Sequence, residues 1–341
     1  MLKKLTLAML TTSMLASTAL ANGPELLIQD FVGTLKIENS AAGNISVTRD
    51  ANMKGVNLIE QGDSLKIDGG ISKPDGNKCK GYYGSFDINM FKKNTSGEFG
   101  GYEDLEDYPQ MTIMAPKETV LIIENSIAFL TAENLGATDL DLRYCGKVNL
   151  GDVMGELRAN IRGSADVTAL DVGDVAVTIK GSGDLDVQNA GFVSLSVTGS
   201  GDAEFENVKS ADVKVTGSGD VDFGNIDGAL AAVSRGSGDI DAGDVAGDFT
   251  YDAGGSGDLD IGDVMGTRIA ITVSGSGDVN IDGGDVKILN ISASGASEVD
   301  YDGTAENADL IATGASDIYV GKVTDEVRSK ERGAAEISIR H

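Results

Sequence analysis

Apolar and polar residues alternate in short runs over most of the chain. The runs 177–179 (Val-Thr-Ile) and 185–187 (Leu-Asp-Val) show this alternation on the two sides of one glycine-rich turn. A period of two residues predicts β-strands that bury one face and leave the other in water. Because glycine-rich turns interrupt the runs at short intervals, the pattern predicts many short strands and an all-β fold.

A repeated motif separates these strands. Residues 181–184 read Gly-Ser-Gly-Asp, and near-copies return every 18 to 20 residues toward the C-terminus. The first glycine of the motif falls at Gly163, Gly181, Gly199, Gly217, Gly236, Gly255, Gly275, Gly295, Gly314 and Gly333. An acidic residue three places later keeps step, as Asp166, Asp184, Asp202, Asp220, Asp239, Asp258, Asp278, Glu298, Asp317 and Glu336. Two weaker registers, around Lys147-Val148 and Ala128-Phe129, precede these, so we expect about twelve copies.

Short strands that recur in one direction at a constant interval predict a stacked architecture. Each coil would hydrogen-bond to the next at a spacing of about 4.8 Å, and the inward Val, Leu and Ile side chains would form one continuous core. The predicted fold is a parallel β-helix (a solenoid) of about twelve coils of 18 to 20 residues. At that spacing twelve coils would be about 55 to 60 Å long.

Two rows of polar residues are expected to mark the turns of this solenoid. In the Gly-Ser-Gly-Asp motif we expect the glycines to reverse the chain at positive φ, and the Asp carboxylate to accept backbone N–H bonds within the bend. A second row keeps nearly the same step and is interpreted as another turn, in which side-chain amides bond along the stack. Its members are Asp152, Asp171, Asn189, Asn207, Asn225, Asp244 and Asp263.

The first residues are typical of an export signal. Lys3 and Lys4 precede a largely apolar run, and Ala19-Leu20-Ala21 supplies the small residues that a signal peptidase needs. The alternative, a membrane anchor, is disfavoured because the run contains Thr and Ser and is short for a bilayer of about 30 Å. We expect cleavage before Asn22, a mature chain without a lipid anchor or a transmembrane segment, and a location in the periplasm or at the cell surface.

The domain organisation follows from these patterns. Residues 1–21 are predicted to be the signal peptide. Residues 22–124 would contain N-terminal strands and the first coils, with a capping insertion at 72–110. Residues 125–341 would form the repeat solenoid.

Composition narrows the possible partners. The formal net charge is −27, and it would be about −29 without the two lysines of the signal segment. Nucleic acid is therefore an improbable partner, since phosphate binding needs a basic surface. The 46 glycines, 4 prolines and absence of Trp also argue against a helical protein.

Catalytic motifs are scarce. The one histidine is His341, so Ser-His, Cys-His and histidine-metal sites are not expected. No phosphate-binding glycine loop is present, and the Gly-Ser-Gly-Asp phrase differs from the nonapeptide calcium repeat in both Asp position and period. Carboxylates alone could still serve a glycan-active β-helix enzyme, which remains the less favoured alternative.

The repeats resemble a known family. The Gly-Ser-Gly-Asp coils follow a segment of apolar alternation, from Phe31–Ile37 through Gly62–Ile67. This combination resembles the head GIN domain family of exported bacterial proteins, which is associated with auto-transporter adhesins. The resemblance implies a right-handed parallel β-helix with an adhesin-like role. Together with the export signal, the acidic composition and the scarcity of catalytic motifs, it leads us to expect an exported, non-enzymatic envelope or surface module that presents a polyanionic β-helix. A divalent-cation-binding envelope protein is the alternative from the binding class. Residues 72–110 depart from the family pattern as an insertion.

The insertion combines aromatic and basic residues, and it contains one of two cysteines. We expect its rings to pack over the open N-terminal end of the solenoid, although a partner surface, glycan or protein could also bind there. Cys79 and Cys145 are predicted to form a disulfide, because the chain is expected to be exported. The residues concerned are Tyr82, Tyr83, Phe86, Phe91, Phe99, Tyr102 and Tyr108, with Lys73, Lys78, Lys80, Lys92 and Lys93.

Carboxylates of the repeat would form a grid on one face. A second outward acidic position follows most motif aspartates, about 6.8 Å along the strand and about 4.8 Å from the next coil. The repulsion could be relieved by N–H bonds, by protonation or by cations, and we expect at most weak Ca²⁺ binding and no other cofactor. The candidate ligands are Asp184, Asp186, Asp202, Asp220, Asp222, Asp239, Asp241, Asp258 and Asp260.

Overall fold

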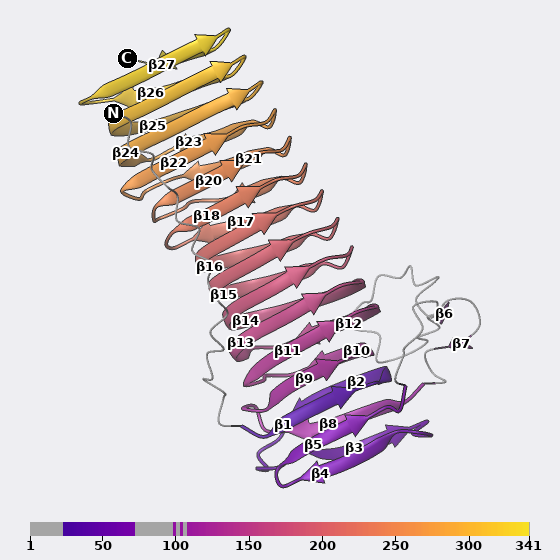
Figure 1. Ribbon diagram of the computed structural model, residues 1–341. Helices are drawn as coiled ribbons and strands as arrows, with labels where there is room; N and C mark the ends of the chain where they lie inside the picture. The colour runs from indigo at the N-terminus through magenta and orange to yellow at the C-terminus, as the bar shows by residue number, and fades with distance from the viewer. Residues whose placement is uncertain (1–22, 72–97, 100–102, 105–107, 341) are drawn as a thin grey trace, which may run out of the picture.

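The computed structural model describes residues 23–71, 98–99, 103–104 and 108–340 (Figure 1). The predicted signal peptide and most of segment 72–110 lie outside the described residues. Within the described part of the chain there is no helix, and the strands stack as a parallel β-solenoid of about twelve turns. The predicted fold class is confirmed.

Two long parallel sheets run along the solenoid, and we call them sheet I and sheet II. Sheet I contains, in stacking order, β4 (Asn57–Gln61), β5 (Ser64–Asp68), β1 (Glu25–Gln29), β9 (Val120–Glu124), β11 (Ala137–Leu142), β13 (Val153–Ile161), the later parts of β14 (Ser164–Ile179), β15 (Leu185–Val197) and β16 (Ala203–Val215), then β18 (Leu230–Ser234), β20 (Phe249–Ala253), β22 (Arg268–Val273), β24 (Asp285–Gly295), the later part of β25 (Glu298–Gly314) and β27 (Val327–Gly333). All neighbours in this order pair in parallel except β4 with β5.

Sheet II forms the other side of the coils. It contains β3 (Ser46–Ala51), β8 (Gln110–Ala115), β2 (Val32–Asn39), β10 (Ile127–Ala132), β12 (Cys145–Leu150), the first parts of β14, β15 and β16, then β17 (Val221–Ile226), β19 (Ile240–Ala242), β21 (Leu259–Asp263), β23 (Val279–Gly283), the first part of β25, β26 (Asp317–Val323) and β28 (Glu336–Ile339). A separate pair, β6 (Glu98–Phe99) and β7 (Glu103–Asp104), is antiparallel.

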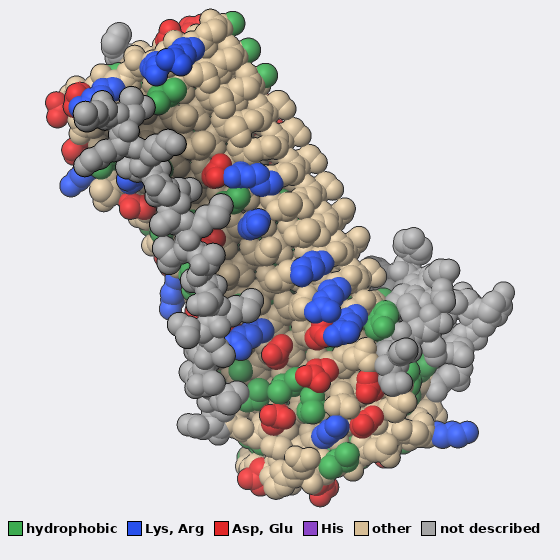
Figure 2. Space-filling model, viewed as in Figure 1, with side chains coloured by type: hydrophobic (Ala, Val, Ile, Leu, Met, Phe, Trp, Pro, Cys, Tyr) green, Lys and Arg blue, Asp and Glu red, His purple; other side chains and the backbone are tan. Residues whose placement is uncertain are grey.

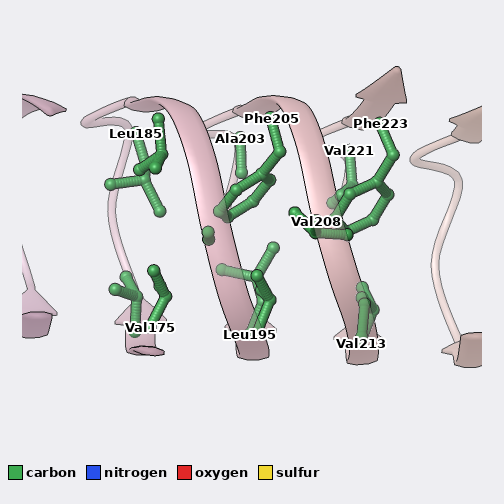
Figure 3. Packing of buried hydrophobic residues seen from close by; sticks show 14 of the residues in the cluster. Val175, Leu185, Leu195, Ala203, Phe205, Val208, Val213, Val221 and Phe223 are labelled. Carbon is green, nitrogen blue, oxygen red and sulfur yellow. The ribbon is translucent and has the colours of Figure 1, made fainter. Parts of the chain in front are cut away.

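The core lies between the two sheets and is continuous along the stack. One cluster of buried apolar side chains extends from Leu26 to Val320. Figure 3 shows three coils of it, in which the side chains of sheets I and II point toward one another. Phe205 and Phe223 occupy equivalent positions in adjacent coils, and their rings stack with centroids 5.1 Å apart. Because the sequence repeats, similar side chains of successive coils lie next to one another inside the solenoid as well as on its surface.

The two weak registers predicted ahead of the motif are confirmed. Lys147 is the register partner of Asp166, and Phe129 is the partner of Lys147. Coils without the Gly-Ser-Gly-Asp phrase thus join the same stack.

Before these coils, the stacking order departs from the chain order. Strands β1 and β2 form a rung that lies between β5 and β9 in sheet I and between β8 and β10 in sheet II. The N–H of Phe31 donates to the hydroxyl of Ser126 at 3.1 Å, across 95 residues of sequence. The first coil in the sequence is therefore inserted between later ones.

The N-terminal end of the solenoid is covered by residues 46–61 in the part of the chain that the structure describes, and capping by the insertion stays a prediction because most of residues 72–110 lie outside it. Strands β3 and β4 pair antiparallel with β8 and β5, which places them at the ends of the two sheets. Val47, Met53 and Val56 pack partly buried against the core there. A reversed strand ends a parallel stack because the next coil cannot continue its register.

The described end of the insertion packs elsewhere. Tyr108 is buried in a separate cluster with Val32, Ile127, Phe129 and Cys145. Phe129 alternates with the core residue Leu130, so this cluster lies on the outer side of sheet II. Tyr108 thus holds the end of this segment on the flank of the first coils.

The glycines of the motif play a different part from the one expected. None of the motif glycines from Gly181 to Gly277 has a positive φ. Positive φ occurs at Gly295, Gly314 and Gly333, where the motif reads Gly-Ala-Ser-Glu, Gly-Ala-Ser-Asp and Gly-Ala-Ala-Glu. In the regular coils a Cβ at Gly238 would lie 2.1 Å from the carbonyl oxygen of Gly219 in the preceding coil. Glycine is required there because the neighbouring backbone occupies the space of a side chain.

A substitution at one corner tests whether glycine is required by the closeness of the neighbouring coil. We expect Gly238→Ala to lower the free energy of unfolding by about 1 to 3 kcal/mol, since the coils must separate locally to admit the methyl group. The matched control is Ser237→Ala in the same corner, an exposed side chain, with an expected change within about 0.5 kcal/mol. Urea unfolding of both variants is the measurement, and equal stabilities would contradict the clash.

Candidate functional site

The motif carboxylates form a hydrogen-bonded ladder along one corner. Oδ1 of each aspartate accepts the backbone N–H of the acidic residue in the next coil, at 2.7 to 3.3 Å. The ladder contains Asp166, Asp184, Asp202, Asp220, Asp239, Asp258, Asp278 and Glu298. The bonds join one coil to the next, whereas the sequence interpretation placed them within a single bend. N–H groups of the backbone thus compensate the charge of the motif row.

The second polar row is a ladder as well, at the opposite corner. The amide of Asn189 donates to Asp171 at 2.7 Å, and that of Asn207 donates to Asn189 at 3.1 Å. Farther along, the N–H of Asp244 donates to Asn225 at 3.1 Å and that of Asp263 to Asp244 at 3.0 Å. Bonding along the stack, predicted for this row, is confirmed.

A third row of acidic side chains stands outward on sheet II. In the described coils, these side chains do not accept a backbone N–H from the next coil, as the motif aspartates do. Each member lies directly beside the next in the register of adjacent strands. The row reads Asp186, Glu204, Asp222, Asp241 and Asp260. Five consecutive carboxylates at the strand spacing of about 4.8 Å repel one another.

Protonation relieves this repulsion at one point of the row. The pKa of Asp241 is raised to about 6, mainly by its partial burial and then by the charge of Asp222 and a side-chain hydrogen bond with it. Asp260 and Asp239 add smaller repulsive effects in the same direction. Asp222 and Asp241 can therefore share a proton under mildly acidic conditions.

The residues predicted as weak calcium ligands divide between two of these rows. Asp184, Asp202, Asp220, Asp239 and Asp258 belong to the ladder, and Asp186, Asp222, Asp241 and Asp260 to the outward row. Among the described residues, no group of three or more His, Cys, Asp or Glu side chains is arranged to hold a metal ion. Calcium binding stays a prediction.

Cys145 is buried on the outer side of sheet II and is disulfide-bonded. The chain contains one other cysteine, Cys79, which lies outside the described residues. The pairing of Cys79 with Cys145 therefore stays a prediction, and Cys145 stands beside the cluster that anchors Tyr108.

One set of charged residues was missed in the sequence. Arg143, Arg162 and Lys180 occupy the position at the end of sheet I in three consecutive coils. Figure 2 shows Lys and Arg side chains in a short column on this face of the molecule. The signal was available, since Arg162 and Lys180 directly precede the first glycine of the motif.

The ladder predicts a contrast between two substitutions at one residue. Asp220→Ala removes the acceptor of the Asp239 N–H, so we expect a loss of about 1 kcal/mol in the free energy of unfolding. Asp220→Asn keeps a side-chain oxygen at the same place and should change stability by less than about 0.5 kcal/mol. Chemical denaturation compares the two; a loss from Asn as large as that from Ala would contradict the ladder.

The raised pKa of Asp241 predicts a pH-dependent stability. Between the ordinary pKa of an aspartate, 3.8, and about 6 the folded chain holds a proton that the unfolded chain releases, so the free energy of unfolding falls as pH rises through this window. At pH about 7.5 Asp241→Asn should therefore stabilise the fold, by about 1 kcal/mol after allowance for solvent screening. At pH about 4 the gain should vanish, because the native side chain is then already neutral.

Asp212→Asn provides the control for this pH profile. Asp212 lies on sheet I, where its register partners are the neutral Ser194 and Ala231. Thermal unfolding across the pH range is the measurement. A gain from Asp241→Asn that is the same at both pH values, or one matched by Asp212→Asn, would argue against the shared proton.

Comparison with known proteins agrees with the resemblance seen in the repeats. Residues 33–242 and 250–341 match the family described as "Putative auto-transporter adhesin, head GIN domain". Neither the curated proteins nor the solved structures contain a match to this chain. The matched segments span nearly the whole solenoid, from β2 to β28, and include the ladder of motif aspartates. The chain therefore belongs to this head GIN domain family.

Proposed function

We propose that the protein is an exported, non-enzymatic rod that presents binding surfaces in the periplasm or at the cell surface. Membership of an adhesin-head family supports a binding role. The continuous parallel solenoid supports a structural one, since a stack of coils makes an extended and regular surface.

The aspartate ladder is the observation that carries this proposal. The most frequently repeated acidic group of the sequence, the motif aspartate, is engaged in bonds between coils over Asp166 to Glu298. A carboxylate that makes the same bond in coil after coil has a structural role, and it does not define a single catalytic centre. Binding then depends on residues that interrupt the repeat, such as the flank anchored by Tyr108 and Cys145.

A glycan-active enzyme is the weaker alternative. A carboxyl with a raised pKa, as at Asp241, is a feature that acid catalysis uses. Asp222 and Asp241 lie, however, in adjacent strands of one regular row of five similar groups. Apart from the raised pKa of Asp241, no feature of the described coils distinguishes this pair from its neighbours in the row, so we favour binding.

Export is the second part of the proposal. It rests on the family and on the apolar N-terminal run that ends in Ala19-Leu20-Ala21. Among the residues that the structure describes, none belongs to a helix suited to crossing a membrane.

Processing and protease accessibility test this proposal together. In a Gram-negative host that expresses the full chain, we expect the mature protein to begin at Asn22 when its intact mass is measured. If the chain is displayed, protease added to intact cells should cut it while a periplasmic marker stays whole; if it is periplasmic, cutting should require opening of the outer membrane. Recovery of the chain in the cytoplasm with residues 1–21 still attached would contradict export.

A further inference from the structure

A column of cations crosses three neighbouring coils at the end of sheet I. The N–H of Arg162 donates to the carbonyl of Leu142 at 2.7 Å, and the N–H of Lys180 donates to that of Ile161 at 2.7 Å. These bonds fix Arg143, Arg162 and Lys180 in register, about 4.8 Å apart from one coil to the next. In the coils that follow, the same position holds neutral side chains at Thr198, Thr216, Gly254, Ser274, Ser294 and Thr313, with Arg235 and Arg332 as exceptions.

The column carries an excess of positive charge on an acidic protein. Asp141 bonds to Arg143 at 2.7 Å, and its other oxygen is 3.6 Å from Arg162. Lys180 forms no ion pair with any residue that the structure describes. Two arginines therefore share one carboxylate while Lys180 has none among the described residues, and the arginine side chains remain 46% and 41% exposed. The chain as a whole has a net charge of −27. A local cluster of cations on such a protein attracts an anionic partner.

The surroundings of the column favour a saccharide over a membrane. Asn160 and Thr178 lie on adjacent strands beside it; Oδ1 of Asn160 accepts from Nε of Arg162 at 3.2 Å, which leaves the amide N–H groups of Asn160 and the hydroxyl of Thr178 for a ligand. Tyr144, next to Arg143, is partly exposed and packs against the outer cluster of Phe129 and Tyr108. An aromatic ring beside polar groups suits a sugar face, and the guanidinium fork suits carboxylate or sulfate oxygens.

Apolar groups that could enter a bilayer lie elsewhere. Met154, Leu170 and Phe192 are exposed, but they lie near the beginning of the strands of sheet I and not at the end that carries the cations. Membrane association through a basic surface is strengthened by apolar side chains beside the charges. The column lacks that combination.

We propose that Arg143, Arg162, Lys180 and Tyr144 bind an acidic polysaccharide, one that carries carboxylate or sulfate groups at regular intervals. The polymer would run along the stack, so that successive anionic groups meet successive coils. This inference rests on the proposed binding function and names the ligand class of one surface.

The acidity of the rest of the rod predicts an unusual dependence on salt. At about 0.01 M ionic strength the screening length is about 30 Å, so the whole negative rod repels a polyanion. At about 0.15 M it is about 8 Å, which screens the distant carboxylates but leaves the direct contacts in place. Binding should therefore be strongest at intermediate salt and weaken again near 1 M.

The experiment uses the mature protein and defined probes. Heparin oligosaccharides and oligogalacturonates supply sulfate and carboxylate groups, dextran is the neutral saccharide, and vesicles of phosphatidylglycerol supply an anionic membrane. The test variant is Arg162→Gln with Lys180→Gln. The matched control is Lys214→Gln with Arg235→Gln, which removes two cations from the same sheet. Thermal unfolding first establishes that both variants are folded.

Calorimetric titration then separates the outcomes. We expect an acidic oligosaccharide to bind the native chain, the test variant to bind about tenfold more weakly or worse, and the control to stay within about twofold. Failure of both acidic probes to bind, or an equal loss in the two variants, would overturn the proposal. Binding of the vesicles alone, lost in the test variant, would assign the column to a membrane and also overturn it. Since the export experiment does not involve these residues, a failure here leaves the broader function separately testable.

Discussion

The hydrogen bond between the backbones of successive coils is the constraint on which this structure depends. It holds coils at the spacing of a parallel sheet, and it does so at the corners as well as in the strands, as the bond from the Ser237 N–H to the Gly217 carbonyl shows. At that spacing the carbonyl oxygen of one corner lies where the Cβ of the next would point. Columns of glycine follow from this geometry, and so do side-chain ladders, because equivalent residues are brought to within hydrogen-bonding distance.

The regular part of the fold could be predicted because its information is local and repeated. A period of 18 to 20 residues specifies the coil, and alternation specifies its inward face. Even coils without the motif, such as that of Lys147, kept the register. The N-terminal rung could not be predicted in the same way. Its place depends on pairing of Thr34 with Gln110 and Phe129, and no short-range pattern encodes that separation.

The acidic residues illustrate the difference between composition and position. Asp220 and Asp222 are two residues apart and chemically identical, yet the first accepts an N–H from the next coil and the second faces Asp241 without one. Sequence reasoning identified both rows but expected the glycines and the carboxylate of each motif to act within a single bend. The glycines and the carboxylate are both required because each lies against the backbone of the neighbouring coil. The basic column is hard to predict for a related reason, since three cations give little signal in a chain with a net charge of −27 until the stacking brings them together.

Hydrogen exchange at the corners tests most directly whether the repeat serves to join coils. The N–H groups of Asp202, Asp220, Asp239 and Asp258 each donate to a carboxylate of the preceding coil. If the corners are held as described, these amides should exchange as slowly as those of the adjoining strands, and protection should extend without a break along the row. Rapid exchange at these four amides, beside slow exchange in the strands, would show that the corners are independent turns and would contradict the account.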